Sequence, residues 1–165
     1  MKTEKKENFV GCIDDVTGAK VVLAGVPYDV TSTFRHGSDE GPDSARKYSD
    51  SIETFSPDRF DDIADHKIAD SGNLVLASQK PEEAVTEIEA YAESFVEKAK
   101  KTLYICGEHL ISYPIVKSYH KKYPGLKVVY FDAHADMRDH YDGNRLSHSA
   151  AARRISEVVG PENIY

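Results

Sequence analysis

Residues 126–136 read LKVVYFDAHAD, an apolar run followed at once by two carboxylates and an imidazole. The run 126–131 predicts a buried parallel strand, and such a strand ends in charged side chains only where something charged binds. Because alternate residues of an extended chain point the same way, Asp132, His134 and Asp136 are expected to converge. Oxygen and nitrogen ligands of this kind suit a hard or borderline divalent metal, so the stretch predicts metal-dependent hydrolysis.

Two further polar clusters occupy comparable places in the chain. The short apolar stretch 102–106 predicts a second strand, and it runs directly into Gly107-Glu108-His109. Downstream, Ser147-His148-Ser149 opens a helix-like segment. Loops at the ends of parallel strands share one edge of an open sheet, where ligands bind. The three clusters are therefore expected to meet, which strengthens the prediction of a metal site.

Strands and helices alternate along the rest of the chain. Apolar runs predict strands at 21–26, 66–69, 102–106 and 126–132. Helical spacing and capping predict helices at 43–53 and 81–101, one ending near 123 and one near 159. The helix 81–101 carries its apolar face on Ala84, Ile88, Tyr91, Ala92, Phe95, Val96 and Ala99. Residues 56–65 are expected to form a polar connection and 70–73 a turn. This alternation predicts an α/β domain with a parallel sheet and right-handed crossovers.

The composition limits the class of protein. With 165 residues, 40% hydrophobic and 30% charged, the chain suits one domain with a real core. No apolar run reaches the length of a membrane helix, and residues 1–10 are polar, are expected to be frayed and lack the apolar core of a signal peptide. Cys12 and Cys106 are too few for a disulfide framework, which fits the cytoplasm. The net charge of −7 argues against a nucleic-acid binder and is compatible with a cationic substrate.

Several short motifs resemble those of the ureohydrolases, the arginase and agmatinase family. They are 106–109 (CGEH), 131–136 (FDAHAD) and 147–148 (SH), together with the N-terminal motifs 25–29 (GVPYD), 33–37 (TFRHG) and 41–46 (GPDSAR). The N-terminal motifs look like the agmatinase branch more than the arginases proper. The resemblance runs from about Val21 to Tyr165, and it implies a three-layer α/β/α fold with a mostly parallel sheet that is incomplete at the C-terminus.

The resemblance also implies that residues 1–165 are the N-terminal portion of a single ureohydrolase domain. Members of the family carry a later Ser-x-Asp-x-Asp type motif with two more metal carboxylates, and the sequence contains no such motif. Residues 163–165 look like the first part of a further strand. We therefore expect a truncated or split gene product, or a fragment.

The metal ligands follow from the same resemblance. The family holds a pair of manganese ions; His109, Asp132 and Asp136 would bind one ion, and His134 with Asp132 would bind the other. Two divalent ions bring four positive charges, whereas Asp132 and Asp136 supply only two negative ones. We therefore expect manganese to be dinuclear in a complete protein, and this chain alone to bind one ion, or two weakly. The residue types alone leave iron, cobalt and zinc open.

Three other polar residues near these motifs are candidates for roles other than binding the metal. His148 matches a mobile, non-ligand histidine of the family, so the resemblance makes it a candidate proton shuttle. Asn144 lies in the loop between the metal motif and His148, where it is a candidate contact for substrate. Glu108 is either an acceptor that orients the His109 ring or a structural carboxylate.

The leading functional hypothesis is agmatinase-type hydrolysis of agmatine to putrescine and urea, with this chain inactive alone. One alternative is a non-catalytic metal-binding remnant or one half of a split protein, completed by a C-terminal polypeptide. Another is hydrolysis of a different guanidino or formimino compound, and a further one is a single-metal amidohydrolase. The resemblance implies a homo-oligomer of trimers or a hexamer that acts on a small cationic guanidino substrate. The charge and the lack of a long apolar run make neither nucleic acid nor membrane an expected partner.

Overall fold

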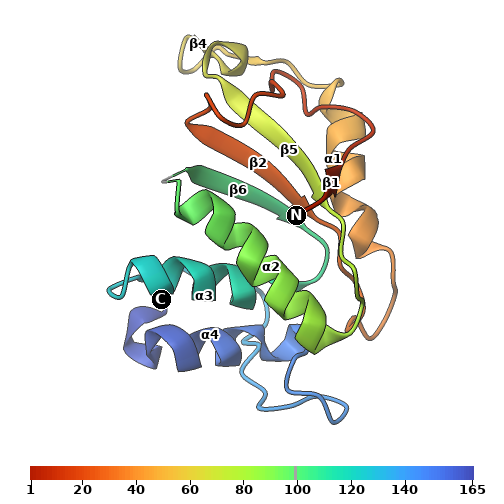
Figure 1. Ribbon diagram of the computed structural model, residues 1–165, viewed down its shortest axis with the longest axis vertical. Helices are drawn as coiled ribbons and strands as arrows, with labels where there is room; N and C mark the ends of the chain where they lie inside the picture. The colour runs from red at the N-terminus through yellow and green to blue at the C-terminus, as the bar shows by residue number, and fades with distance from the viewer. Residues whose placement is uncertain (99) are drawn as a thin grey trace.

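A computed structural model of the chain describes residues 1–98 and 100–165. Its main sheet has the strand order β1-β5-β2-β6 (Figure 1), formed by β1 (Thr3–Glu4), β5 (Ile68–Leu74), β2 (Val21–Val26) and β6 (Lys101–Cys106). Both neighbours of β2 run parallel to it, and only β1 is antiparallel. The predicted α/β fold with a mostly parallel sheet is therefore confirmed.

Helices cover both faces of this sheet. They are α1 (Gly41–Ser49), α2 (Pro81–Val96), α3 (Ser112–Lys122) and α4 (Ala151–Val159). Side chains at alternate positions of β2, such as Val22 and Ala24, join the apolar core beneath α2. Gly25 points the opposite way, where a Cβ would lie 3.1 Å from Pro42 of α1. The α1 helix thus packs on one face and α2 on the other, which gives the expected three layers (Figure 1).

The helices α2, α3 and α4 lie in a row that extends past the β6 edge of the sheet (Figure 1). Lys117 of α3 ties the first two together, because its Nζ lies 2.7 Å from Glu89 Oε2 of α2. Short 3-10 turns connect the larger elements: η1 (Ser38–Glu40), η2 (Ile63–Asp65), η3 (His109–Ile111), η4 (His148–Ala150) and η5 (Pro161–Asn163). Among the described residues, no helix has the length and apolar character needed to cross a membrane.

A buried ion pair fixes α1 to β5. The Arg46 side chain is 1% exposed and that of Asp70 is 0% exposed, and Arg46 Nε donates to Asp70 Oδ2 at 2.7 Å. Burial opposes the charged form of Asp70, but the hydrogen bonds and charge of Arg46, together with hydrogen bonds from the Phe9 and Gly72 N–H groups, outweigh it and hold the pKa of Asp70 below its ordinary value. The predicted turn at 70–73 is wrong, because these residues continue β5, where Asp70 and Asn73 serve as partners for Arg46.

The predicted strand at 126–132 is also wrong. Only Val128 forms a β-bridge there, parallel to Ile164, and the Val129 and Phe131 residues are 65% and 95% exposed. The segment is hydrogen-bonded to the end of the chain, for example from the Tyr165 N–H to the Val128 carbonyl at 2.9 Å. It is not paired with β6, whose neighbour in the sheet is β2. Because this run is not paired with the main sheet, side chains such as Val129 and Phe131 stay on the surface.

Smaller differences concern element ends. The helix predicted at 43–53 is α1, and that predicted at 81–101 ends at Val96, with the predicted apolar residue Ala99 outside the described residues. The polar connection contains a small hairpin of β3 (Phe55–Ser56) and β4 (Asp61–Asp62). The N-terminal segment expected to be frayed supplies β1, and its Phe9 N–H donates to Asp70 Oδ2 at 3.0 Å.

Candidate metal centre

The loop after β6 presents His109 at the end of the sheet. Gly107 lies so close to the neighbouring loop that a Cβ would be 2.1 Å from the Tyr28 carbonyl oxygen, so only glycine fits. Its N–H donates to the Val26 carbonyl of β2 at 3.0 Å, which extends the strand pairing beyond Cys106. The backbone therefore holds the start of η3, where His109 stands, in a fixed place.

Three of the predicted ligands come together at this point. His109 Nδ1 lies 2.9 Å from Asp132 Oδ2 and 2.8 Å from Asp136 Oδ2. One ligand atom from each residue lies within 4.8 Å of the other two. A nitrogen and two carboxylate oxygens at such short separations are a donor set that suits a divalent transition metal. The two carboxylates would balance the charge of one ion.

His134 lies beside this group without entering it. Its side chain is 82% exposed, and its Nδ1 is 3.3 Å from Asp132 Oδ1. Its backbone N–H donates to the same oxygen at 2.7 Å, and this hydrogen bond is the main reason that the pKa of Asp132 is lowered. The chain turns at Asp136, which has a φ of 45°, so the segment is not extended throughout and simple alternation does not apply.

Tyr130 is a member of the cluster that sequence reasoning missed. Its hydroxyl lies 3.3 Å from His109 Nδ1 and 3.1 Å from Asp136 Oδ2, and its ring stacks on the His109 ring at 5.2 Å. Burial, together with the nearby Asp136 charge, raises the pKa of this hydroxyl, so it remains a donor to the carboxylates. Its position two residues before Asp132 was the available signal, because the two share a side of the chain.

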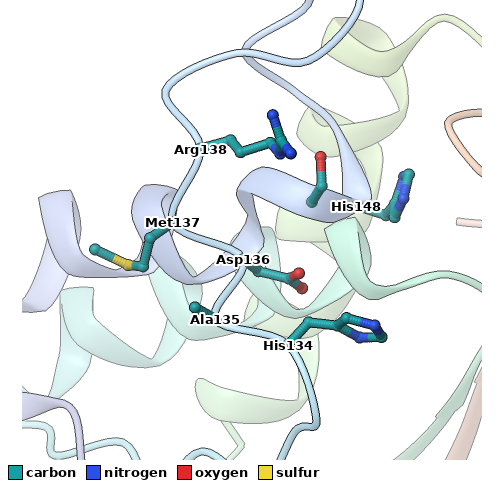
Figure 2. A pocket seen from close by; sticks show the side chains of 7 residues that line it. His134, Ala135, Asp136, Met137, Arg138 and His148 are labelled. Carbon is teal, nitrogen blue, oxygen red and sulfur yellow. The ribbon is translucent and has the colours of Figure 1, made fainter.

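His148 faces a cavity next to the metal ligands. The cavity has a volume of about 500 Å³ and is lined by His134, Ala135, Asp136, Met137, Arg138, His148 and Ser149. Figure 2 shows the side chains of His134, Asp136 and His148 on the same open side, whereas Met137 points away. A half-buried imidazole beside a possible ion is in a suitable place to exchange protons.

Asn144 lies in a separate place. Its Oδ1 accepts a hydrogen bond from the Leu146 N–H at 2.7 Å, which shapes the loop before His148. It lines a second cavity of about 350 Å³, with Thr31 and Ser147 among its neighbours. One face of its amide is therefore used by the loop, and the amide nitrogen is the group left for another contact.

Glu108 is buried between these loops, with 6% of the residue exposed. Its carboxylate accepts hydrogen bonds from the Thr31 N–H at 2.7 Å and the Thr31 hydroxyl at 2.6 Å. Burial raises the pKa of Glu108, and the Thr31 hydrogen bonds offset part of the rise. The role of orienting the His109 ring, one of the two considered for Glu108, is not observed among the described residues, because the carboxylate is directed at Thr31.

Known proteins resemble this chain along most of its length. The family described as "Arginase family" matches residues 19–165. The agmatinase of Bacillus subtilis is 41% identical over 157 residues, which cover 95% of this chain and 54% of that protein. The N(1)-aminopropylagmatine ureohydrolase of Thermococcus kodakarensis is 32% identical over 149 residues, covering 89% of this chain and 50% of that protein.

Solved structures give the same picture. The agmatine ureohydrolase of Thermoplasma volcanium superposes with a TM-score of 0.88 at 26% identity, covering 98% of this chain and 56% of that one. A Trypanosoma cruzi formiminoglutamase solved with Mn²⁺ has a TM-score of 0.74 at 24% identity, covering 84% of this chain and 48% of that one, a likeness of fold. The chain spans about half the length of the relatives it matches.

Proposed function

Because the chain belongs to the arginase family, we propose that it supplies the metal-binding part of an agmatinase-type hydrolase, which converts agmatine to putrescine and urea. The observation that carries the proposal is the meeting of His109, Asp132 and Asp136 at the end of the sheet. The agmatinase and agmatine ureohydrolase among its relatives favour agmatine over other guanidino compounds.

The donor set fits the proposed metal. One imidazole nitrogen and two carboxylate oxygens lie within 4.8 Å of one another, and manganese is the ion that the likeness to ureohydrolases implies. Asp132 and Asp136 neutralise one divalent ion, and a second ion would find only His134 added to a shared Asp132. We therefore propose one ion, or two bound weakly, in this chain, and a pair in a complete protein. When bound, the metal supplies Lewis-acid activation of water near neutral pH.

The remaining roles belong to the chain's own residues. We assign His148 the movement of a proton at its imidazole, because it lines the same cavity as Asp136. Asn144 is proposed to bind substrate through its amide nitrogen, since its oxygen is used by Leu146.

The proposal also covers the cellular compartment and the partners of the chain. Cys12 and Cys106 are both free thiols, in agreement with a reducing cytoplasm. We propose a homo-oligomer, or a complex with a polypeptide that supplies the second half of the relatives' length. Neither nucleic acid nor membrane is among the proposed partners.

The direct test is urea release from agmatine with added Mn²⁺. This chain alone is compared with the same chain joined to the part of the Bacillus subtilis agmatinase that it does not match. We expect urea only from the joined protein, and none from its His109→Ala variant. His66→Ala is a matched control, because His66 is exposed and pairs with Asp61 far from the ligands.

Other results would change the assignment. Manganese binding without urea release would contradict the proposal of agmatine as substrate and favour a different guanidino or formimino compound as substrate. Urea release by this chain alone would show that the ligands present suffice, against the charge argument. Failure of the chain and the joined protein to bind metal would contradict both the agmatinase proposal and the metal-binding remnant.

A further inference from the structure

Glu108 is a buried polar group that the proposed reaction does not use. It lies one residue before His109, at the point where β6 gives way to η3. Its own N–H donates to the Tyr28 carbonyl at 2.9 Å, which fixes its backbone against the loop that follows β2. A buried carboxylate is costly unless hydrogen bonds compensate it, so the partners of Glu108 show what holds it there.

Those partners come from one loop. Thr31 donates twice, from its N–H to Oε2 at 2.7 Å and from its hydroxyl to Oε1 at 2.6 Å. Ser32 adds a weak contact from its hydroxyl at 3.4 Å. Because β2 and β6 are neighbours in register up to Val26 and Cys106, the loops that carry Thr31 and Glu108 leave the sheet together.

The Thr31 hydroxyl has a second partner. The His148 N–H, at the start of η4, donates to Thr31 Oγ1 at 2.8 Å. An N–H can only donate, so the single hydroxyl proton of Thr31 must point to Glu108. The order of donors is therefore fixed along the chain of contacts from His148 through Thr31 to Glu108.

We propose that Glu108 is a positioning residue that acts through Thr31 to hold His148 beside the metal ligands. The proposal rests on the proposed function, since His148 matters here as the group that moves a proton. The first N–H groups of a helix have no partner within it, and Thr31 satisfies the one that belongs to His148. The imidazole then faces the cavity that it shares with Asp136.

The position of Glu108 explains why a carboxylate is needed there. Each of its two oxygens accepts from one donor of Thr31, and an amide keeps only one of these two oxygens. Replacement by glutamine would turn an amide N–H toward Thr31, and the hydroxyl would lose its fixed direction. The N–H of His148 would then lose part of its acceptor. The carboxylate thus holds the Thr31 hydroxyl proton toward itself, which leaves the hydroxyl oxygen free to accept from the His148 N–H.

Amide hydrogen exchange at His148, measured on this chain by NMR, tests the proposal without any activity. We expect Thr31→Val to speed exchange of the His148 N–H about tenfold, the equivalent of one ordinary hydrogen bond, and Glu108→Gln to act in the same direction. Thr31→Ser keeps the hydroxyl and is expected to restore the slow rate. Ser32→Ala is the matched control and should leave it unchanged.

The Ala150 N–H, which donates to the Ser147 carbonyl at 2.9 Å in the same turn, reports on general loosening. Equal acceleration at Ala150 and His148 would overturn the proposal, because the variants would then only weaken the helix start. A normal His148 rate in Glu108→Gln would overturn it as well, since Glu108 would not act through Thr31.

In whichever form of the protein releases urea, Thr31→Val should lower kcat about tenfold and leave KM unchanged, with Thr31→Ser restoring kcat. Unchanged kcat would overturn the catalytic purpose of the contact. If no form releases urea from agmatine but the exchange results hold, the proposed function fails and the positioning of His148 stands.

Discussion

The strand β2 and the segment 126–131 are both six-residue apolar runs, and they have opposite surroundings. In β2 the residues Val22, Ala24 and Val26 are 0% exposed, and hydrogen-bonded strands lie on both sides. In the segment 126–131, Phe131 is 95% exposed and a single bridge at Val128 is the only strand-like pairing within the described part of the chain. The difference teaches that an apolar pattern makes a segment suitable for burial, whereas its neighbours decide whether burial occurs.

The largest difference in stability is expected when the same charge is placed in each region. Val22→Asp would bury an unpaired carboxylate in the centre of β2 and should lower the free energy of unfolding by about 4 kcal/mol or more. Val129→Asp, at a 65% exposed position, should change it by less than about 0.5 kcal/mol. Urea denaturation followed by circular dichroism measures both, and similar losses would contradict the comparison.

The support that β2 receives from its neighbour β5 can be tested through the buried ion pair. Arg46→Met leaves Asp70 charged and buried, so we expect a loss of about 3 kcal/mol in the free energy of unfolding. The double variant Arg46→Met, Asp70→Leu removes both charges and should recover at least part of this loss. Denaturation curves for the two proteins measure this, and a double variant with a lower free energy of unfolding than the single variant would contradict the expectation.

A bound ion should make the segment 126–131 more like β2, because it would tie Asp132 and Asp136 to His109. With Mn²⁺ at about one hundred times its Kd, we expect the free energy of unfolding to rise by about 2.7 kcal/mol and EDTA to reverse the rise. Thermal denaturation gives the shift, and amide exchange at Val128 should slow.

The matched variants for this prediction are His109→Ala, which should abolish the shift, and His134→Ala, which should keep most of it. His109 is in the ligand group, whereas the His134 side chain is 82% exposed beside it. Equal shifts in the two variants would mean that the ion binds elsewhere.

The smallest expected effect concerns the exposed apolar surface. Phe131→Ser should leave the free energy of unfolding within about 0.5 kcal/mol, because the residue is 95% exposed, and should reduce association between copies of this chain. Phe34→Ser is the control, since Phe34 is 89% exposed on a loop. Sedimentation velocity would show the change, and an equal response in both variants would argue against a specific role for the segment.

The sequence predicts well those elements whose type is visible in the periodicity of their own apolar residues. The apolar run 21–26 and the face of helix 81–96 occur as expected, because a central strand and a covering helix are both visible in local periodicity. Prediction from the sequence fails at 70–73, because Asp, Ser, Gly and Asn are typical of turns and the segment is part of a strand. These residues stay in β5 because Arg46, from a different element, neutralises Asp70.

The candidate site shows the same division. The ends of the predicted strands already indicate that His109, Asp132 and Asp136 should meet, because chemistry-bearing loops gather at one sheet edge. Thr31 gives no comparable signal, since a hydroxyl in a loop is common and its partners Glu108 and His148 are distant in sequence. Contacts of that kind depend on how loops approach one another in space.

The strand order has a consequence for synthesis on the ribosome. Every strand of the β1-β5-β2-β6 sheet is complete by Cys106, before Asp132 is made. At roughly 5–20 residues per second, the sheet with His109 at its edge emerges about a second or more before the two carboxylates arrive. The nascent chain would therefore form the sheet first and add the acidic ligands to it. All three ligands are available to bind a metal only after translation has passed Asp136.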